Sequence, residues 1–227
     1  STAEIFSKHL QTAFDTSSKN VCLAGYPRND IFFNKLYTTA PKQYDGKFDY
    51  LILYLPTFRS GKSINSLLNE YAYSSKRMHK LLEKINGLLI IKAHFASDRT
   101  WIDIDERISI IENDPLLDIN HILIDTDILI TDYSGCYFDF LLLDKPIIFA
   151  PFDYEQYISE DRELYFDYNE IIAGPKASNW KEVENEILSI YNGLDLYKQK
   201  RAEMTDKFNE FRDSNSSKRL FDIISKT

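Results

Sequence analysis

Hydrophobic residues along this chain form short, nearly unbroken runs that alternate with segments of helical periodicity. Runs expected to be strands lie at 21–24, 48–55, 88–94, 108–111, 128–131 and 145–150. Unbroken apolar runs of this length are typical of strands buried on both faces, as in parallel sheets. Helical spacing of apolar residues is found at 1–16, 64–85, 115–123, 135–143 and 179–226.

This alternation predicts an α/β fold with a Rossmann-like, doubly wound parallel sheet and a helical C-terminal tail. We expect three parts: the edge or remnant of another unit at 1–24, a nucleotide-binding domain at 25–178, and helices packing on it at 179–227. In such sheets, ligands bind at the carboxyl ends of strands, near the point where strand order reverses. The polar motifs of this sequence directly follow predicted strands.

Charge and composition exclude several classes of protein. With 27 basic and 35 acidic residues among 227, the chain carries a net charge of −8, which argues against a general nucleic-acid-binding role. Cys22 and Cys136 form no paired framework, which favours a reducing compartment. No signal peptide is recognisable, and no apolar run approaches the roughly 20 residues of a membrane span. We therefore expect a cytoplasmic, soluble chain.

The strongest candidate site follows the strand at 128–131, where Asp132, Ser134 and Gly135 open a helix and Asp139 lies about a turn further on. Helix N-terminal amides, a hydroxyl and a glycine that allows close approach together favour phosphate binding. Asp139 would then face ribose hydroxyls. The alternative is that Ser134 merely caps the helix and Asp139 is solvated.

Two cationic or proton-donating side chains follow other strands. Thr57 and Arg59 come after the strand at 48–55, and Arg59 could clamp a phosphate through two hydrogen bonds. His94 ends the strand at 88–94 and could contact a phosphoryl oxygen or act as a general acid. The alternatives are an exposed arginine in a turn and a histidine at the edge of the core.

A tyrosine-rich stretch follows the last predicted strand, from 152 to 168, and includes Arg162. Its aromatic rings could pack on a base or a polyol, and Arg162 could pair with phosphate; the alternative is loop packing over the sheet edge. No metal-ligand spacing, Walker loop, G-x-G-x-x-G or G-x-S-x-G motif is present.

Taken in order, several of these segments together resemble the CDP-glycerol glycerophosphotransferase family of teichoic-acid and capsule polymerases. The matching segments are Gly25-Tyr26-Pro27-Arg28-Asn29-Asp30, Leu55-Pro56-Thr57-Phe58-Arg59, Ile91-Lys92-Ala93-His94, Asp127 to Ser134, Phe138-Asp139-Phe140, Lys145 to Phe149, Arg162 to Tyr168, and Gly174-Pro175.

The resemblance implies one half of a GT-B-type fold and a CDP-glycerol or CDP-ribitol donor, with no tightly bound cofactor and a role for Mg²⁺ left open. It implies that His94 contacts the donor diphosphate, that Ser134 and nearby amides bind phosphate with help from Arg59, and that Asp132 and Asp139 are structural or ribose-side residues. The implied acceptor is a polymer or lipid-linked chain, which would bring the protein to the inner face of the membrane.

Two features depart from the family pattern. The family usually has proline after the histidine, where this chain has Phe95 after His94. Family members also carry an earlier His-Gly-x-Pro-x-Lys segment, whose histidine is the expected catalytic base, and this sequence lacks it. We therefore expect a C-terminal, donor-binding half that acts with an N-terminal catalytic half in cis or in trans.

Two other functions remain open at this point. The same fold could form the donor-binding half of a nucleotide-sugar glycosyltransferase. Alternatively, the chain could be a non-catalytic interaction module that kept the fold. Analogy of fold does not choose among the three.

Overall fold

The computed structural model describes residues 1–34, 46–59, 64–92, 105–111, 118–161 and 163–226. Within them, five parallel strands form one sheet in the order β3-β2-β1-β4-β5. The strands are β1 (Tyr50–Leu55), β2 (Gly87–Lys92), β3 (Ile108–Ile111), β4 (Ile128–Thr131) and β5 (Ile147–Phe149). The predicted α/β fold with a doubly wound parallel sheet is confirmed.

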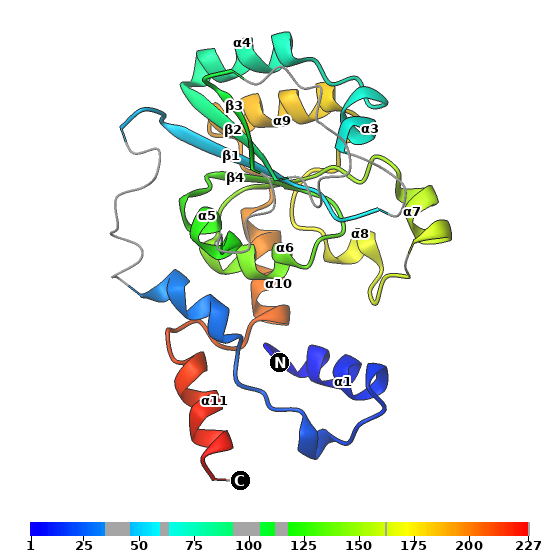
Figure 1. Cartoon of the computed structure of the whole chain (residues 1–227), viewed down its shortest axis with the longest axis vertical. Coiled ribbons are helices and arrows are strands. Elements are labelled where there is room, and N and C mark those ends of the chain that lie inside the picture. Colours follow the sequence, from blue (N-terminus) through cyan, green and yellow to red (C-terminus); the bar gives the residue numbers. More distant parts are fainter. Residues whose placement is uncertain (35–45, 60–63, 93–104, 112–117, 162, 227) are drawn as a thin grey trace.

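Helices cover both faces of this sheet (Figure 1). One face carries α3 (Ile64–Asn69), α4 (Ser75–Ile85) and α9 (Trp180–Tyr191), and the other carries α5 (Ile119–Asp125), α6 (Cys136–Phe140) and α10 (Lys198–Phe208). The remaining helices are α1 (Glu4–Ala13), α7 (Tyr154–Glu160), α8 (Tyr168–Ile171) and α11 (Ser216–Ile224), with 3-10 helices η1 (Ser18–Asn20), η2 (Pro27–Phe33) and η3 (Leu141–Leu143).

Alternation along the central strand explains why β1 is apolar throughout. Leu51, Leu53 and Leu55 belong to the core on the α5, α6 and α10 face, whereas Ile52 and Tyr54 belong to the core beneath α4 and α9. Because both faces are covered, no position of the strand needs a polar side chain. This is the physical reason for the unbroken apolar runs in the sequence.

One predicted strand is absent from the sheet. Residues 21–24 were expected as a strand, but they belong to no strand of the structure. Instead, the backbone N–H groups of Ala24 and Gly25 donate to the carbonyl of Ser1, at 3.2 and 2.9 Å. These backbone N–H groups are therefore hydrogen-bonded to the N-terminal residue rather than to a neighbouring strand.

The two ends of the chain pack against the same body as the sheet. Phe6 of α1 lies 5.1 Å from Phe138, 5.8 Å from Phe166 and 5.3 Å from Phe208, measured between ring centroids. Asp30 accepts hydrogen bonds from the backbone N–H groups of Ser216 and Ser217, both at 2.8 Å, at the start of α11. The predicted domain boundaries at 24 and 178 stay predictions.

Close packing beside β5 generates the first testable prediction. A Cβ at Gly174 would lie 1.9 Å from the carbonyl oxygen of Ile147, because the segment after Gly174 runs against this strand. Gly174→Ala should therefore lower the free energy of unfolding by about 1–3 kcal/mol, measured by urea denaturation.

Gly135→Ala is the matched control for this measurement. A Cβ there meets no atom within 4 Å, and the backbone φ of −62° suits alanine. Its stability should stay level or rise slightly. Equal losses in the two variants would contradict the packing argument.

Candidate functional site

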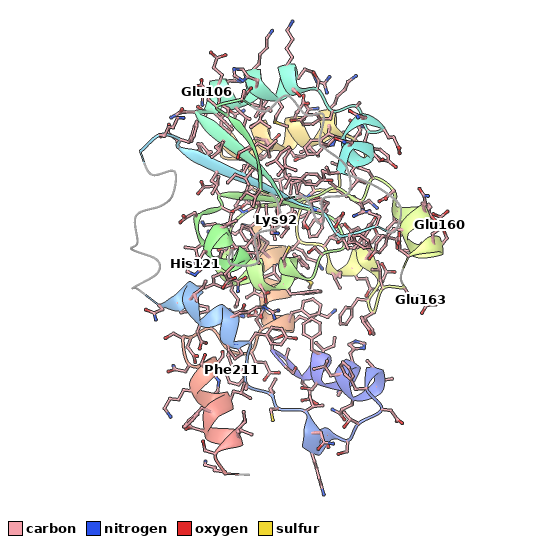
Figure 2. The ribbon with its side chains drawn as sticks, viewed as in Figure 1. Lys92, Glu106, His121, Glu160, Glu163 and Phe211 are labelled. Atoms are coloured by element: carbon pink, nitrogen blue, oxygen red, sulfur yellow. The ribbon has the colours of Figure 1, made fainter. Side chains whose placement is uncertain are left out.

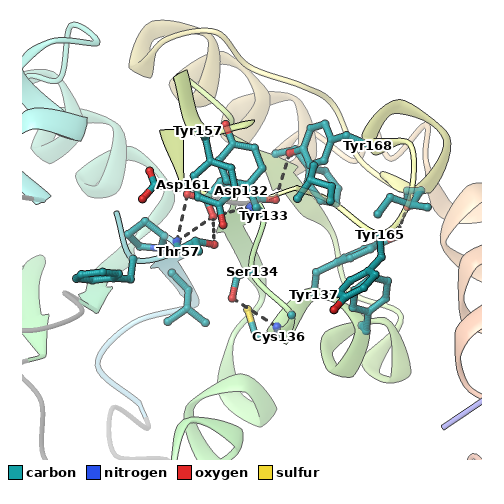
Figure 3. A pocket seen from close by; sticks show the side chains of 18 of the residues that line it. Thr57, Asp132, Tyr133, Ser134, Cys136, Tyr137, Tyr157, Asp161, Tyr165 and Tyr168 are labelled. Atoms are coloured by element: carbon teal, nitrogen blue, oxygen red, sulfur yellow. Dashed lines mark hydrogen bonds between the residues drawn. The ribbon is translucent and has the colours of Figure 1, made fainter. Parts of the chain in front are cut away.

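A pocket of about 1300 Å³ opens at the carboxyl ends of β1 and β4, where the order of strands reverses (Figure 3). Its described lining combines the turns after these strands with an aromatic wall from α1, α6, α7 and α8. The lining includes Phe6, Pro56, Thr57, Lys92, Asp118, Asp132, Tyr133, Ser134, Gly135, Cys136, Tyr137, Phe138, Tyr157, Glu160, Asp161, Glu163, Tyr165, Phe166 and Tyr168. Doubly wound sheets bind their ligands at this position.

A buried ion-pair cluster joins the ends of three strands at the base of this site. Arg59, after β1, donates to Asp132, after β4, at 2.5 Å, and donates twice to Asp153, after β5, at 3.0 and 2.8 Å. All three residues are at most 5% exposed. Charge-assisted pairs of this geometry fix the relative positions of the groups they join. The cluster therefore holds the three turns in register.

Thr57 completes the hold on Asp132. Its backbone N–H and its hydroxyl both donate to the carboxylate, at 2.9 and 2.6 Å (Figure 3). Burial by itself would lower the pKa of Arg59, but hydrogen bonds to Asp153 and the charges of both carboxylates outweigh it and raise that pKa. The guanidinium is thus a permanent positive charge that already has two carboxylate partners. A direct contact of Arg59 with phosphate stays a prediction.

Stacked tyrosines cover this cluster on the pocket side. Tyr133 and Tyr157 stack with centroids 4.1 Å apart and planes at 17°, and the Arg59 guanidinium lies 5.1 and 5.3 Å from their rings. The hydroxyl of Tyr168 donates to the backbone carbonyl of Asp132 at 3.2 Å. Burial, followed by the charges of Asp153 and Asp132, raises the pKa of Tyr133. Burial likewise raises the pKa of Tyr168, so the phenols of Tyr133 and Tyr168 are neutral near neutral pH.

Ser134 and Gly135 form the turn between β4 and α6, as the sequence predicted. Gly135 is exposed and has no neighbour within 4 Å of its Cβ position, so a ligand can approach the backbone closely. The Ser134 hydroxyl accepts a long hydrogen bond, 3.5 Å, from the N–H of Cys136. The helix that follows is short, because α6 ends at Phe140 and continues as the 3-10 turn η3.

Asp139 is bonded by other side chains and does not line the pocket. Arg28 donates to its carboxylate at 2.9 Å and Asn29 at 2.8 Å, so that η2 is tied to α6. Its side chain is 7% exposed, and it is absent from the pocket lining. Of the two roles that the resemblance implied, these contacts support the structural one.

Lys92 is a pocket residue that the sequence analysis did not select. It ends β2 next to the switch point, and it is the only lysine or arginine among the lining residues that the structure describes. Its position at a strand end was the available signal, but the sequence pattern favoured His94, two residues later. His94 and Arg162 both lie outside the described residues, so their predicted roles stay predictions.

Carboxylates outnumber this single lysine in the described lining. Even so, no group of three or more histidine, cysteine, aspartate or glutamate side chains in the described part of the chain is arranged to hold a metal ion. Among the same residues, no helix combines the length and apolar character needed to cross a bilayer.

The doubly wound parallel sheet, with a pocket at its switch point, has the architecture of one half of a GT-B-type fold. The structure of the wall teichoic acid polymerase TagF superposes on this chain with a TM-score of 0.79 at 22% identity, covering 100% of this chain and 57% of that one. A TagF variant soaked with CDPG superposes with a TM-score of 0.82 at 23% identity, covering 100% of this chain and 55% of that one. A UDP-GlcNAc 2-epimerase from Neisseria meningitidis superposes less closely, with a TM-score of 0.55 at 14% identity, covering 100% of this chain and 60% of that one. These likenesses support the fold.

The sequence identifies the family. The profile of CDP-Glycerol:Poly(glycerophosphate) glycerophosphotransferase matches residues 1–226, and the chain belongs to this family. It is 29% identical to the teichoic acid ribitol-phosphate polymerase TarL of Staphylococcus aureus, over 92% of this chain and 37% of that protein. It is 30% identical to the teichoic acid glycerol-phosphate primase of Bacillus subtilis, over 98% of this chain and 54% of that protein. The chain thus spans between about a third and a half of the length of these relatives.

The buried cluster generates the second prediction. Asp153→Ala removes the acceptor of two buried Arg59 donors, at Nε and Nη2, so the free energy of unfolding should fall by about 1–3 kcal/mol in urea denaturation. Asp222→Ala is the control, because its pair with Lys218 is exposed and should contribute far less. Similar losses in both variants would show that the cluster does not hold the strand ends.

Cys136 supplies the third prediction. Burial raises the pKa of its thiol to about 12. At pH 8 only about one molecule in 10⁴ would then carry the thiolate, which is the reactive form. Alkylation by iodoacetamide, followed by mass spectrometry, should therefore be far slower at Cys136 in the folded chain than in the urea-unfolded chain. Equal rates in the two states would refute this assignment.

Proposed function

We propose that this chain supplies the donor site of a transferase that moves glycerol phosphate or ribitol phosphate from a CDP-activated donor to a teichoic-acid-like polymer. The observation that carries the proposal is the family match over residues 1–226, together with a pocket at the switch point that the family's motifs line. Because the relatives are longer, their complete activity is part of the proposal.

In the proposed reaction, the acceptor hydroxyl attacks the β-phosphorus of the CDP-polyol and CMP leaves. The bond between the β-phosphorus and the bridging oxygen breaks, and that oxygen takes the electron pair. Such transfers depend on positioning and on neutralising charge rather than on covalent catalysis. The described part of the pocket offers Lys92, the Ser134 hydroxyl and the backbone at Gly135 for this purpose.

We assign the remaining predicted residues as follows. His94 contacts the donor phosphate or protonates the leaving oxygen, and Arg162 adds a second positive charge. Arg59, Asp132 and Thr57 hold the turns, since their polar groups already bond one another. Asp139 positions α6 through Arg28 and Asn29.

The aromatic wall of the pocket fits the nucleoside. Tyr165 lines the pocket and is 71% exposed, so its ring is available for stacking. Glu163 lies two residues away in the same wall. A carboxylate accepts a hydrogen bond from the exocyclic amine of cytosine and repels the carbonyl that uracil has there. This favours a cytidine donor over the uridine donors of the rival glycosyltransferase function.

Four further assignments belong to the proposal. An N-terminal half, in cis or in trans, supplies the base for the acceptor hydroxyl. The acceptor is a polymer or a lipid-linked chain, so the protein works in the cytoplasm at the inner face of the membrane. Mg²⁺, if it is needed, arrives with the diphosphate. Capsule polymers belong to the same acceptor class.

Calorimetry with CDP-glycerol provides the fourth prediction. CDP-glycerol should bind more tightly than UDP-N-acetylglucosamine, and Lys92→Gln should weaken CDP-glycerol binding about tenfold, because a charge-assisted hydrogen bond to phosphate is lost. Lys207→Gln removes an exposed lysine on α10 and serves as the control.

Three outcomes separate the candidate functions. Equal affinity for the two nucleotides would favour the glycosyltransferase alternative. Absence of binding to either would favour a non-catalytic module. Full affinity in Lys92→Gln would remove Lys92 from the donor site while leaving the family assignment intact.

A further inference from the structure

The outer face of α4 carries a row of three lysines, Lys76, Lys80 and Lys84 (the lysine row). All three are exposed, and none forms an ion pair with any residue in the part of the chain that the structure describes. Four residues of helix rise by about 6 Å, so the charges follow one another at that interval and turn slowly around the axis. Like charges four residues apart destabilise a helix. The row therefore has a cost, which Glu83 on the same exposed side reduces only in part.

The lysine row stands on a firmly anchored helix. Met78, Leu81, Leu82 and Ile85 of α4 are buried in the core above the sheet. Arg77 lies beside the row but is already paired, donating to Glu184 of α9 at 3.0 Å. The positions of the three lysine backbones are thus fixed, while their ammonium groups reach into solvent.

The direction of α4 places one end of the lysine row at the edge of the sheet where the pocket opens. Just before the helix, Tyr71 stacks on Phe152, which follows β5, with centroids 5.0 Å apart. Just after the helix, the carbonyl of Asn86 accepts from the N–H of Asp49, which precedes β1, at 2.8 Å. Lys76 is therefore the lysine nearest the carboxyl edge, and the row leads away from it along α4. In Figure 2 this helix lies at the opposite end of the molecule from α11.

We propose that the lysine row binds the phosphodiester backbone of the acceptor polymer. This inference rests on the proposed function, which makes the acceptor a chain of polyol phosphates. Such a chain carries one negative charge per repeat, and an extended glycerol phosphate repeat of six backbone bonds spans about 7 Å. That interval is close to the rise between successive lysines. One rigid row can thus contact three consecutive phosphates.

A linear polyanion fits this surface better than an anionic bilayer does. Helices that lie in a membrane interface present apolar side chains next to their lysines. The apolar residues of α4 are all turned inward, and its exposed face offers charge alone. A single narrow row of charges can follow an extended polymer chain, whereas a bilayer presents a broad surface.

Glu83 is the one acidic residue on the exposed side of α4. It lies three residues after Lys80, within reach of the same polymer backbone. Its charge repels phosphate and weakens the row. Removing this carboxylate should therefore raise the affinity for the polymer, whereas removing the lysines should lower it. Loss of charged residues elsewhere on the surface would not produce these opposite changes.

The fifth prediction compares two triple variants of the full chain. Labelled poly(glycerol phosphate) oligomers of increasing length are titrated into the parent, into a variant with Lys76, Lys80 and Lys84 changed to glutamine, and into one with Lys8, Lys198 and Lys207 changed to glutamine. The control removes the same charge from exposed positions on α1 and α10. The first variant should bind about tenfold more weakly and the control close to normally. Glu83→Gln should bind more tightly.

Length and donor binding complete the test. Affinity of the parent should rise until the oligomer spans the row, whereas free glycerol phosphate binds weakly. Equal affinities of the two triple variants, or preference of the lysine row for anionic vesicles over polymer, would overturn the inference. CDP-glycerol binding is measured in the same variants and should not change. If the parent does not bind CDP-glycerol, the proposed function is contradicted. If it binds CDP-glycerol but the lysine-row variant binds the polymer as tightly as the parent, only the role of the lysine row is contradicted.

Discussion

The buried pairing of Arg59 with Asp132 and Asp153 is the constraint on which the site depends. Three strands end at the same edge of the sheet, and their turns carry polar groups that must keep fixed positions without a ligand. The guanidinium of Arg59 and its two carboxylate partners fix these positions. The rings of Tyr133 and Tyr157 cover the guanidinium. Burying three charges is costly, and apolar residues could fill the same volume. We therefore interpret the cluster as serving to position the three turns rather than to stabilise the fold.

This arrangement separates the groups that hold the site from those that face its contents. Asp132 and Asp139 look like candidate substrate ligands in the sequence, yet both are saturated by protein donors. Lys92, Ser134 and Gly135 remain at the pocket surface, together with an aromatic wall. A diphosphate can then meet positive charge and backbone at one end while the nucleoside packs at the other. Preorganised groups of this kind lose little freedom when the ligand arrives.

Local patterns predicted most of the fold because β1, β2, β4 and β5 are buried on both faces, and such runs stand out in a sequence. The strand predicted at 21–24 is absent because the backbone N–H groups of Ala24 and Gly25 bond the carbonyl of Ser1. This partner lies far away in the sequence, so no local pattern announces it. The same limit applies to the site. Arg59 was expected to meet phosphate, but its carboxylate partners lie 73 and 94 residues away in the sequence. Asp153 could not be selected without knowing that three turns converge.

The central place of β1 has a consequence for how the chain comes to be folded. Its neighbour β4 is far downstream, and Thr131 donates to the carbonyl of Leu55 across 76 residues. The earliest of the five described strands must therefore wait for one of its partners to leave the ribosome, with an apolar edge unpaired in the meantime. Nonlocal parallel pairing of this kind slows folding and exposes aggregation-prone surface. Chaperone dependence during synthesis is the expected cost of placing the earliest of these strands in the middle of the sheet.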